Sequence, residues 1–164
     1  SSCGPKEQGT NNIAQGHPNA NKESIAQILD TFHAAAARAD FQAYFDCLRD
    51  NAVFMGTDAT EHWTKPAFMQ WAKPFFDRKS AWHFTSAQKH IYFSQDGHTA
   101  WFDELLQTQM KICRGSGVLS RQQGRWKIEQ YVLSRTIPNA LSDRVTELKA
   151  TTEDSLLQTL LPKK

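Results

Sequence analysis

The stretch from Ala81 to Ser134 reads AWHFTSAQKHIYFSQDGHTAWFDELLQTQMKICRGSGVLSRQQGRWKIEQYVLS and decides the fold. Runs rich in aromatic and β-branched residues recur along it, at Trp82–Ser94, Thr99–Gln109, Lys111–Gln122 and Arg125–Arg135. Asp96-Gly97 separates the first two runs, and Gln123-Gly124 separates the last two. Asp-Gly favours the positive φ angles of a two-residue type I′ hairpin turn. The pattern therefore predicts four long strands in an antiparallel meander.

The segments on either side of this stretch predict helices. Between Ser24 and Ala39, apolar residues recur at i, i+3, i+4 and i+7, which is typical of an amphipathic helix, with Asn21 as its N-cap. Asp40 is placed to cap a short second helix, and Thr64 a third. The remaining expected elements are a strand at Ala52–Thr57 and a C-terminal helix at Leu141–Leu161.

Composition limits the classes of function. The chain has 164 residues and a net charge of +2, and its charges are interspersed, which does not favour nucleic acid as a partner. No apolar run approaches the roughly 18 residues of a membrane span. Three cysteines and six histidines lack metal-ligand spacing, so neither a metal site nor a cofactor is predicted. Cys47 and Cys113 are expected to be small buried residues.

The first twenty residues differ from the rest. They are rich in Gly, Asn and Gln and contain almost no bulky apolar side chain, so residues 1–20 are predicted to be a flexible polar tether before a single domain, 21–164. Ser1-Ser2-Cys3-Gly4 resembles the end of a bacterial lipoprotein signal. This resemblance implies a lipid on Cys3 and a location in the cell envelope, facing the periplasm, or secretion. The alternative is an ordinary cysteine in a tail.

Five further segments carry a family resemblance: DNAVFMG (50–56), GTDATEHW (56–63), DGHTAWFDE (96–104), RGSGVL (114–119) and GRWKIEQY (124–131). With the order of elements over residues 24–140, the chain resembles the SnoaL-like branch of the nuclear transport factor 2-like superfamily. The resemblance implies an α+β, cone-shaped barrel of the cystatin-like type, in which a curved antiparallel sheet wraps a long N-terminal helix and leaves a pocket at the open end. Members include isomerases, dehydratases, cyclases and associative domains, so fold alone does not assign a function.

Strand alternation predicts which side chains face the interior. Pairing outward from Asp96-Gly97 places Lys89 opposite Glu104, and pairing from Gln123-Gly124 places Gly117 opposite Gln130. The better hydrophobic face is assigned to the interior and carries Ile91, Phe93, Ala100, Phe102, Leu119, Trp126 and Ile128. Gly115, Gly117, Glu104 and Gln130 share this face. Because mid-strand glycines often mark a place where space is needed, we expect a cavity beside them.

Glu104 is the candidate catalytic base, and Gln130, Gly115 and Gly117 are candidate ligand-binding residues. The competing interpretation is that Glu104 pairs with Lys89 across the strands. Three more residues are assigned to the pocket mouth as candidate ligand contacts: Asp58, Trp63 and Arg114. Asp58 has the alternative of forming its own turn, and Trp63 that of packing in the core.

The opposite face of the sheet is unexpectedly apolar, since a free antiparallel face is usually polar. We expect a second subunit to cover it, which predicts a homodimer through Tyr92, Trp101, Leu105, Tyr131 and Leu133. His90 opposite Asp103 on this face predicts a cross-strand ion pair rather than a catalytic dyad.

The sequence therefore predicts a domain that binds a small, partly apolar organic molecule in its cone. Whether it is an enzyme stays open. If it is, the chemistry expected is acid–base isomerisation, dehydration or cyclisation, with Glu104 as base. The alternative is a non-catalytic homodimeric association or carrier domain. A buried, unpaired Glu104 would favour chemistry, and a Glu104 paired with Lys89 would favour binding or a scaffold.

Overall fold

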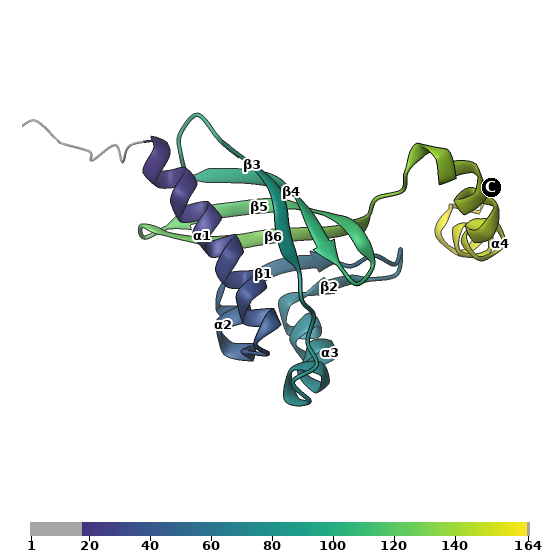
Figure 1. Ribbon diagram of the computed structural model, residues 1–164, viewed down its shortest axis with the longest axis horizontal. Coiled ribbons are helices and arrows are strands. Elements are labelled where there is room, and N and C mark those ends of the chain that lie inside the picture. The colour runs from purple at the N-terminus through teal and green to yellow at the C-terminus, as the bar shows by residue number, and fades with distance from the viewer. Residues whose placement is uncertain (1–17, 164) are drawn as a thin grey trace, which may run out of the picture.

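The computed structural model describes residues 18–163 (Figure 1). Cys3 and the other residues before Pro18, which hold most of the expected tether, lie outside the described residues. The elements in chain order are α1 (Pro18–Ala37), α2 (Phe41–Asp46), β1 (Leu48–Met55), β2 (His62–Thr64), α3 (Lys65–Asp77), β3 (Thr85–Phe93), β4 (Thr99–Thr108), β5 (Lys111–Gln122), β6 (Arg125–Arg135), a 3-10 turn (Asn139–Leu141) and α4 (Ser142–Leu160). The expected meander is present as β3 to β6.

The six strands form one curved sheet in the order β2-β1-β6-β5-β4-β3. Neighbouring strands are antiparallel except β1 and β6, which are parallel. Helices α1, α2 and α3 lie on the concave side (Figure 1). The predicted α+β fold, with a curved sheet around a long N-terminal helix, is confirmed. The sheet does not close into a barrel, because β2 and β3 remain as its two edges.

The core lies between α1 and the concave face of the sheet. The apolar side of α1 buries Ile25, Leu29, Phe32 and Ala36, as its spacing predicts. At the start of α2, the Asp40 side chain accepts a hydrogen bond from the backbone N–H of Ala43 at 3.0 Å. Helix α1 begins at Pro18 rather than near Ser24, so the expected Asn21 cap is wrong.

The register of β3 and β4 agrees with the prediction. Phe93 pairs with Ala100, Lys89 with Glu104 and His90 with Asp103. The connection is not a type I′ turn, however, because only Gly97 has a positive φ and Ser94 bonds Thr99 across a longer loop. The Asp96 carboxylate accepts hydrogen bonds from the Ser94 hydroxyl and the His98 N–H, which stabilise this loop. The register is unchanged because both turns leave the same residues opposed.

The register of β5 and β6 departs from the prediction in the middle of the strands. Leu119 pairs with Ile128 as expected, but the next pair is Val118 with Gln130. Glu129 is therefore an extra residue, a β-bulge that reverses the alternation beyond it. Tyr131 and Leu133 consequently turn inward and are buried, at 1% and 6% exposure, and Gln130 turns outward. The assignments of Gln130 to the interior and of Tyr131 and Leu133 to the outer face are wrong.

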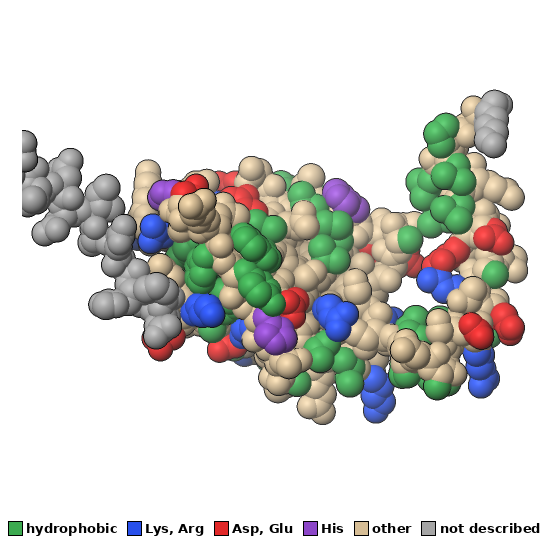
Figure 2. Space-filling model, turned by 90° about the horizontal axis from the view of Figure 1, so that it is seen from above, with side chains coloured by type: hydrophobic (Ala, Val, Ile, Leu, Met, Phe, Trp, Pro, Cys, Tyr) green, Lys and Arg blue, Asp and Glu red, His purple; other side chains and the backbone are tan. Residues whose placement is uncertain are grey.

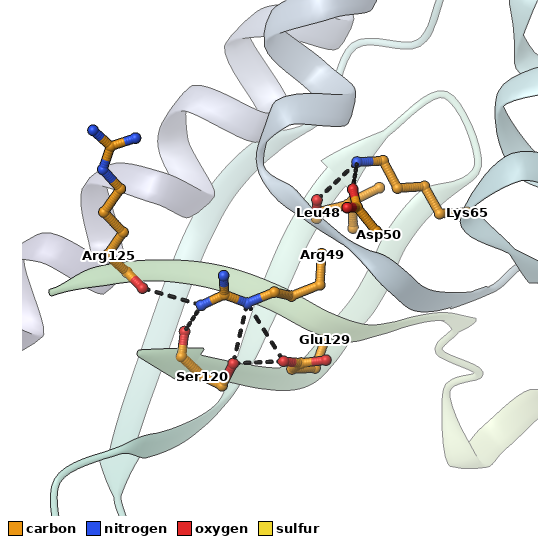
Figure 3. A network of polar contacts seen from close by, with 7 residues as sticks. All are labelled: Leu48, Arg49, Asp50, Lys65, Ser120, Arg125 and Glu129. Atoms are coloured by element: carbon orange, nitrogen blue, oxygen red, sulfur yellow. Dashed lines mark hydrogen bonds and ion pairs between the residues drawn. The ribbon is translucent and has the colours of Figure 1, made fainter. Parts of the chain in front are cut away.

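A polar network holds the bulge (Figure 3). The Arg49 guanidinium, on β1, donates to the backbone carbonyls of Ser120 at 2.9 Å and of Arg125 at 3.1 Å. The same side chain forms an ion pair with Glu129 at 3.5 Å, and Glu129 also accepts from the Ser120 hydroxyl. Because a single side chain reaches three backbone or bulge positions, Arg49 ties β1 to the β5–β6 hairpin.

Helix α4 projects from the sheet at the C-terminal end and lies apart from the other helices (Figure 1). Its contacts are with the preceding 3-10 turn, and no described strand packs closely along it. Hydrophobic side chains gather on α4 without cover (Figure 2). The most exposed are Leu148, Leu160 and Leu161. Within residues 18–163, no helix has both the length and the apolarity that crossing a membrane requires.

Candidate ligand-binding site

A cavity of about 180 Å³ opens between α3, the β1–β2 loop and the β4–β5 turn. Six of its twelve lining residues are aromatic: Phe54, Trp63, Phe68, Trp71, Trp82 and Phe84. The rest of the lining is Gly56, Thr57, Glu61, Gln109, Met110 and Leu133. Trp63 lines this cavity and also packs against the core, and its contact with a ligand stays a prediction. The cavity does not border Gly115 and Gly117, where a cavity was expected.

The aromatic wall follows from the spacing of α3. Phe68 and Trp71 lie one turn apart on the helix, and each packs against Trp63 of β2, with ring centroids 5.4 Å and 4.8 Å away. The ring planes are close to parallel, with interplanar angles of 14° for Trp63 and Phe68 and 29° for Trp63 and Trp71. Phe54 continues the stack behind Phe68 at 4.1 Å. The wall is thus a set of nearly parallel rings, which suits a flat ligand.

Glu61 supplies the carboxylate of the cavity. The β1–β2 loop is closed by hydrogen bonds from Gly56 N–H to the Glu61 carbonyl at 2.9 Å and from Glu61 N–H to the Asp58 carbonyl at 3.0 Å. The Glu61 side chain accepts from the Asp58 N–H at 3.0 Å through Oε1. A Cβ on Gly56 would lie 2.8 Å from Glu61 Oε2, so a side chain there would displace the carboxylate.

Asp58 has a different role from the one expected. Its carboxylate accepts from the Thr60 N–H at 2.9 Å and the Thr60 hydroxyl at 2.6 Å. These two hydrogen bonds lower the pKa of Asp58, which is exposed and does not line the cavity. The assignment of Asp58 as a ligand contact is wrong, since its side chain forms the turn that carries Glu61. The acidic residue of this loop that lines the cavity is Glu61.

Glu104 faces the interior, as predicted, but in a sealed cluster. Its Oε1 lies 2.6 Å from His33 Nε2 of α1 and accepts a hydrogen bond from the Tyr131 hydroxyl at 2.8 Å. Its Oε2 is buried without a hydrogen-bond partner among the described residues. Burial, and then the Glu104 carboxylate, raise the pKa of Tyr131, so the phenol keeps its proton and donates. Glu104 is not part of the cavity wall.

Lys89 does not pair with Glu104. Its ammonium group reaches α1 instead and binds Asp30 at 2.7 Å. The competing interpretation of Glu104 as half of a cross-strand ion pair is therefore wrong, and its partners are His33 and Tyr131. Neither partner was found from the sequence. The signal for His33 is its position four residues after Leu29, on the buried side of α1.

The two mid-strand glycines leave no space for a ligand. A Cβ on Gly115 would overlap the Tyr131 hydroxyl and lie 3.1 Å from Glu104 Cγ. A Cβ on Gly117 would overlap the backbone carbonyl oxygen of Gln130. Both glycines face inward as predicted, but the bulge in β6 fills the space they leave. Their assignment to the ligand site is wrong, because the Tyr131 side chain and the Gln130 backbone occupy the space beside them.

Arg114 and the cysteines complete the predicted set. Arg114 is exposed on the outer face beside Leu105, away from the cavity, so its assignment to the pocket rim is wrong. Cys47 and Cys113 are buried, as predicted. Burial raises the pKa of the Cys47 thiol to about 11, which keeps it protonated and unreactive.

The outer face of the sheet retains part of its predicted character. His90 and Asp103 form the expected ion pair at 2.8 Å, with both side chains half-exposed. Tyr92 stacks on Trp101, with ring centroids 6.1 Å apart, and both stay exposed. Tyr131 and Leu133 are absent from this face, so the apolar residues that β3 to β6 place on it are Tyr92, Trp101, Leu105, Ile112, Val118 and Val132.

The fold and the cavity define a class of protein: an α+β domain whose open, curved sheet holds a pocket against its helices. The family model described as a SnoaL-like domain matches residues 25–138, and the chain belongs to that family. No curated protein matches the chain.

Solved structures agree on the fold. A protein of unknown function from Pseudomonas putida KT2440, of the nuclear transport factor 2-like type, is 16% identical, with a TM-score of 0.63 over 76% of this chain and 92% of that one. A Streptomyces avermitilis protein provisionally named a dehydratase of that family is 15% identical, with a TM-score of 0.61 over 74% and 100%. The association domain of Caenorhabditis elegans CaMKII is 17% identical, with a TM-score of 0.60 over 71% and 97%.

Proposed function

We propose that this domain binds a small, flat organic molecule in the aromatic cavity. The observation that carries the proposal is the wall of six aromatic residues around about 180 Å³. An apolar cavity of about 150 Å³ is large enough to hold benzene. A ring of that size would bury its faces against Trp63, Phe68 and Trp71, where removal of apolar surface from water favours binding.

The structure supports ligand binding better than it supports catalysis with Glu104 as the base. A general base must come within hydrogen-bonding reach of the proton it removes. Glu104 is 1% exposed, its Oε1 is occupied by His33 and Tyr131, and it does not border the cavity. The provisional dehydratase name of one structural neighbour belongs to that protein, and another neighbour is an association domain, so the fold alone favours neither role.

Toluene is expected to bind the cavity saturably. Titration should shift the indole N–H resonances of the three cavity tryptophans, Trp63, Trp71 and Trp82, and leave those of Trp101 and Trp126 in place. Trp71→Ala should weaken binding about fivefold or more, because truncating a buried aromatic contact costs about 1 kcal/mol or more. Trp101→Ala is the matched control, since the two side chains are 41% and 45% exposed. Absence of saturable shifts in the wild-type protein, with toluene and with a charged probe of the same shape alike, would refute the proposal.

A second candidate function is self-association. It is favoured by the uncovered apolar surface on the outer sheet face and on α4, where Leu148 is 75% exposed. Most helical stability in proteins comes from tertiary packing, and α4 packs closely only against the preceding 3-10 turn, so a partner would stabilise it. We propose a homodimer in which a second copy covers the outer face around Tyr92 and Trp101. The similarity of the fold to the CaMKII association domain supports this proposal.

Trp101→Glu is expected to convert a dimer into a monomer. A carboxylate at the centre of an apolar interface would be desolvated without a partner, which costs several kcal/mol. Light scattering after size exclusion measures the mass, and circular dichroism checks that the fold survives. The control is Trp71→Glu, which places the same charge on an equally exposed tryptophan outside the outer face and should leave the dimer intact. A wild-type protein that is monomeric at micromolar concentration would contradict the proposal.

A further inference from the structure

The lining of the cavity carries negative charge and no positive charge. Glu61 is the single charged residue in its lining, which contains no Lys, Arg or His. This contrasts with the chain as a whole, which carries a net charge of +2. A ligand entering this cavity therefore meets one negative group and no positive one.

The Glu61 carboxylate has no cationic partner of its own. None of the ion pairs formed within residues 18–163 includes it, and its one hydrogen bond comes from the Asp58 N–H to Oε1. It is held at the cavity by the closed β1–β2 loop and by the absence of a side chain on Gly56. A carboxylate that the fold positions but does not pair is available to a cation from outside.

The aromatic wall favours the same sign of charge. The face of an aromatic ring is the negative end of its quadrupole, and tryptophan attracts cations most strongly. Three tryptophans and Glu61 line this one cavity. The near-parallel planes of Trp63, Phe68 and Trp71 suit a planar cation, which can continue the stack while its charge lies near Glu61.

We infer that the ligand of the aromatic cavity is a small planar organic cation, of the class of the N-alkylated nitrogen heterocycles, with Glu61 as its counter-charge. This inference rests on the proposed binding function and adds the charge of the ligand. Glu61 recognises the charge, and the six aromatic residues recognise the flat hydrophobic body.

The test compares two probes of the same shape, N-methylpyridinium, which is charged, and toluene, which is neutral. Both are titrated into the full chain, with the tryptophan indole resonances as readout. Glu61→Gln removes the charge but keeps a side-chain oxygen for the Asp58 N–H. We expect Glu61→Gln to weaken the binding of N-methylpyridinium about tenfold, which is the effect of losing one charge-assisted contact. The binding of toluene should change less than about twofold.

Gly56→Ala is a second variant that keeps the carboxylate but displaces it, because a Cβ there would crowd Glu61 Oε2. Gly56→Ala should also weaken the binding of N-methylpyridinium more than the binding of toluene. If Glu61→Gln changes both probes equally, or neither, the cation inference is overturned and the proposed binding function stands. If neither probe binds the wild-type protein, the binding function itself fails. Tighter binding of benzoate than of N-methylpyridinium would likewise overturn the assigned charge.

Discussion

Gly117→Ala is expected to destabilise the domain by about 3 kcal/mol or more, at the upper end of what overpacking costs, although it adds a single methyl group. The methyl would overlap the backbone carbonyl oxygen of Gln130 and lie 3.0 Å from the Phe102 ring. A flexible side chain could move away, but this carbonyl belongs to the β6 bulge that Arg49 and Glu129 hold in place. Denaturant unfolding measures the loss, and a fall in melting temperature of roughly 10 °C should accompany it.

Ser116→Ala is the control for this prediction. Ser116 is the preceding residue of β5, and its side chain points to the outer face, where the smaller side chain meets no backbone. Surface changes of this kind stay within about 0.5 kcal/mol. Equal stability of the Gly117→Ala and wild-type proteins would show that the strands can separate at the bulge, and would restore the sequence-based expectation of free space beside Gly117.

The sequence predicted the sheet where local chemistry sets the register. The Asp96-Gly97 loop gave every opposed pair from Phe93–Ala100 to Lys89–Glu104 correctly, even though its turn type was wrong. Register in a hairpin depends on which residues the loop brings opposite each other, and two loop geometries can bring the same ones together. The inward faces of β4 and β5 followed from this pairing.

The prediction failed where a tertiary contact sets the geometry. Regular alternation was extended through β6, but the strand has two successive polar residues, Glu129 and Gln130, between buried Ile128 and Tyr131. That doubled polar step is the sequence signal of a bulge, because it lets both Ile128 and Tyr131 face the core. The bulge itself is held by Arg49, from a strand about eighty residues earlier, which no local pattern reveals.

The surroundings of the candidate site residues followed from the sequence only in part. Trp63 lies at a cavity, as the resemblance of the GTDATEHW segment implied, and it also packs against the core. The sequence does not reveal which acidic residue of this loop lines the cavity, because the hydrogen bonds from Thr60 to the Asp58 carboxylate are seen only in the structure. His33 lies 71 residues from Glu104 in the chain, so their contact follows only from how α1 crosses the sheet.

Adjacent residues of β4 allow a matched comparison of two histidine–carboxylate pairs. Glu104 pairs with His33 in the core and Asp103 pairs with His90 on the surface, at 2.6 Å and 2.8 Å. The distances are similar, but the first pair is buried and the second is half-exposed. Exposed ion pairs contribute about 0–1 kcal/mol, whereas breaking a buried one costs about 3–5 kcal/mol. Burial rather than distance should therefore decide the effect of each.

Glu104→Leu is expected to lower the free energy of unfolding by about 4 kcal/mol, because it leaves the His33 imidazole and the Tyr131 hydroxyl buried without their acceptor. Asp103→Asn should cost less than about 1 kcal/mol. The decisive variant combines His33→Leu, Glu104→Leu and Tyr131→Phe. If the cluster is structural, replacing all three polar groups should recover most of the loss, since no buried group is then unpaired. Urea unfolding of the four proteins measures these differences. A combined variant less stable than Glu104→Leu would show instead that the core needs the polar cluster.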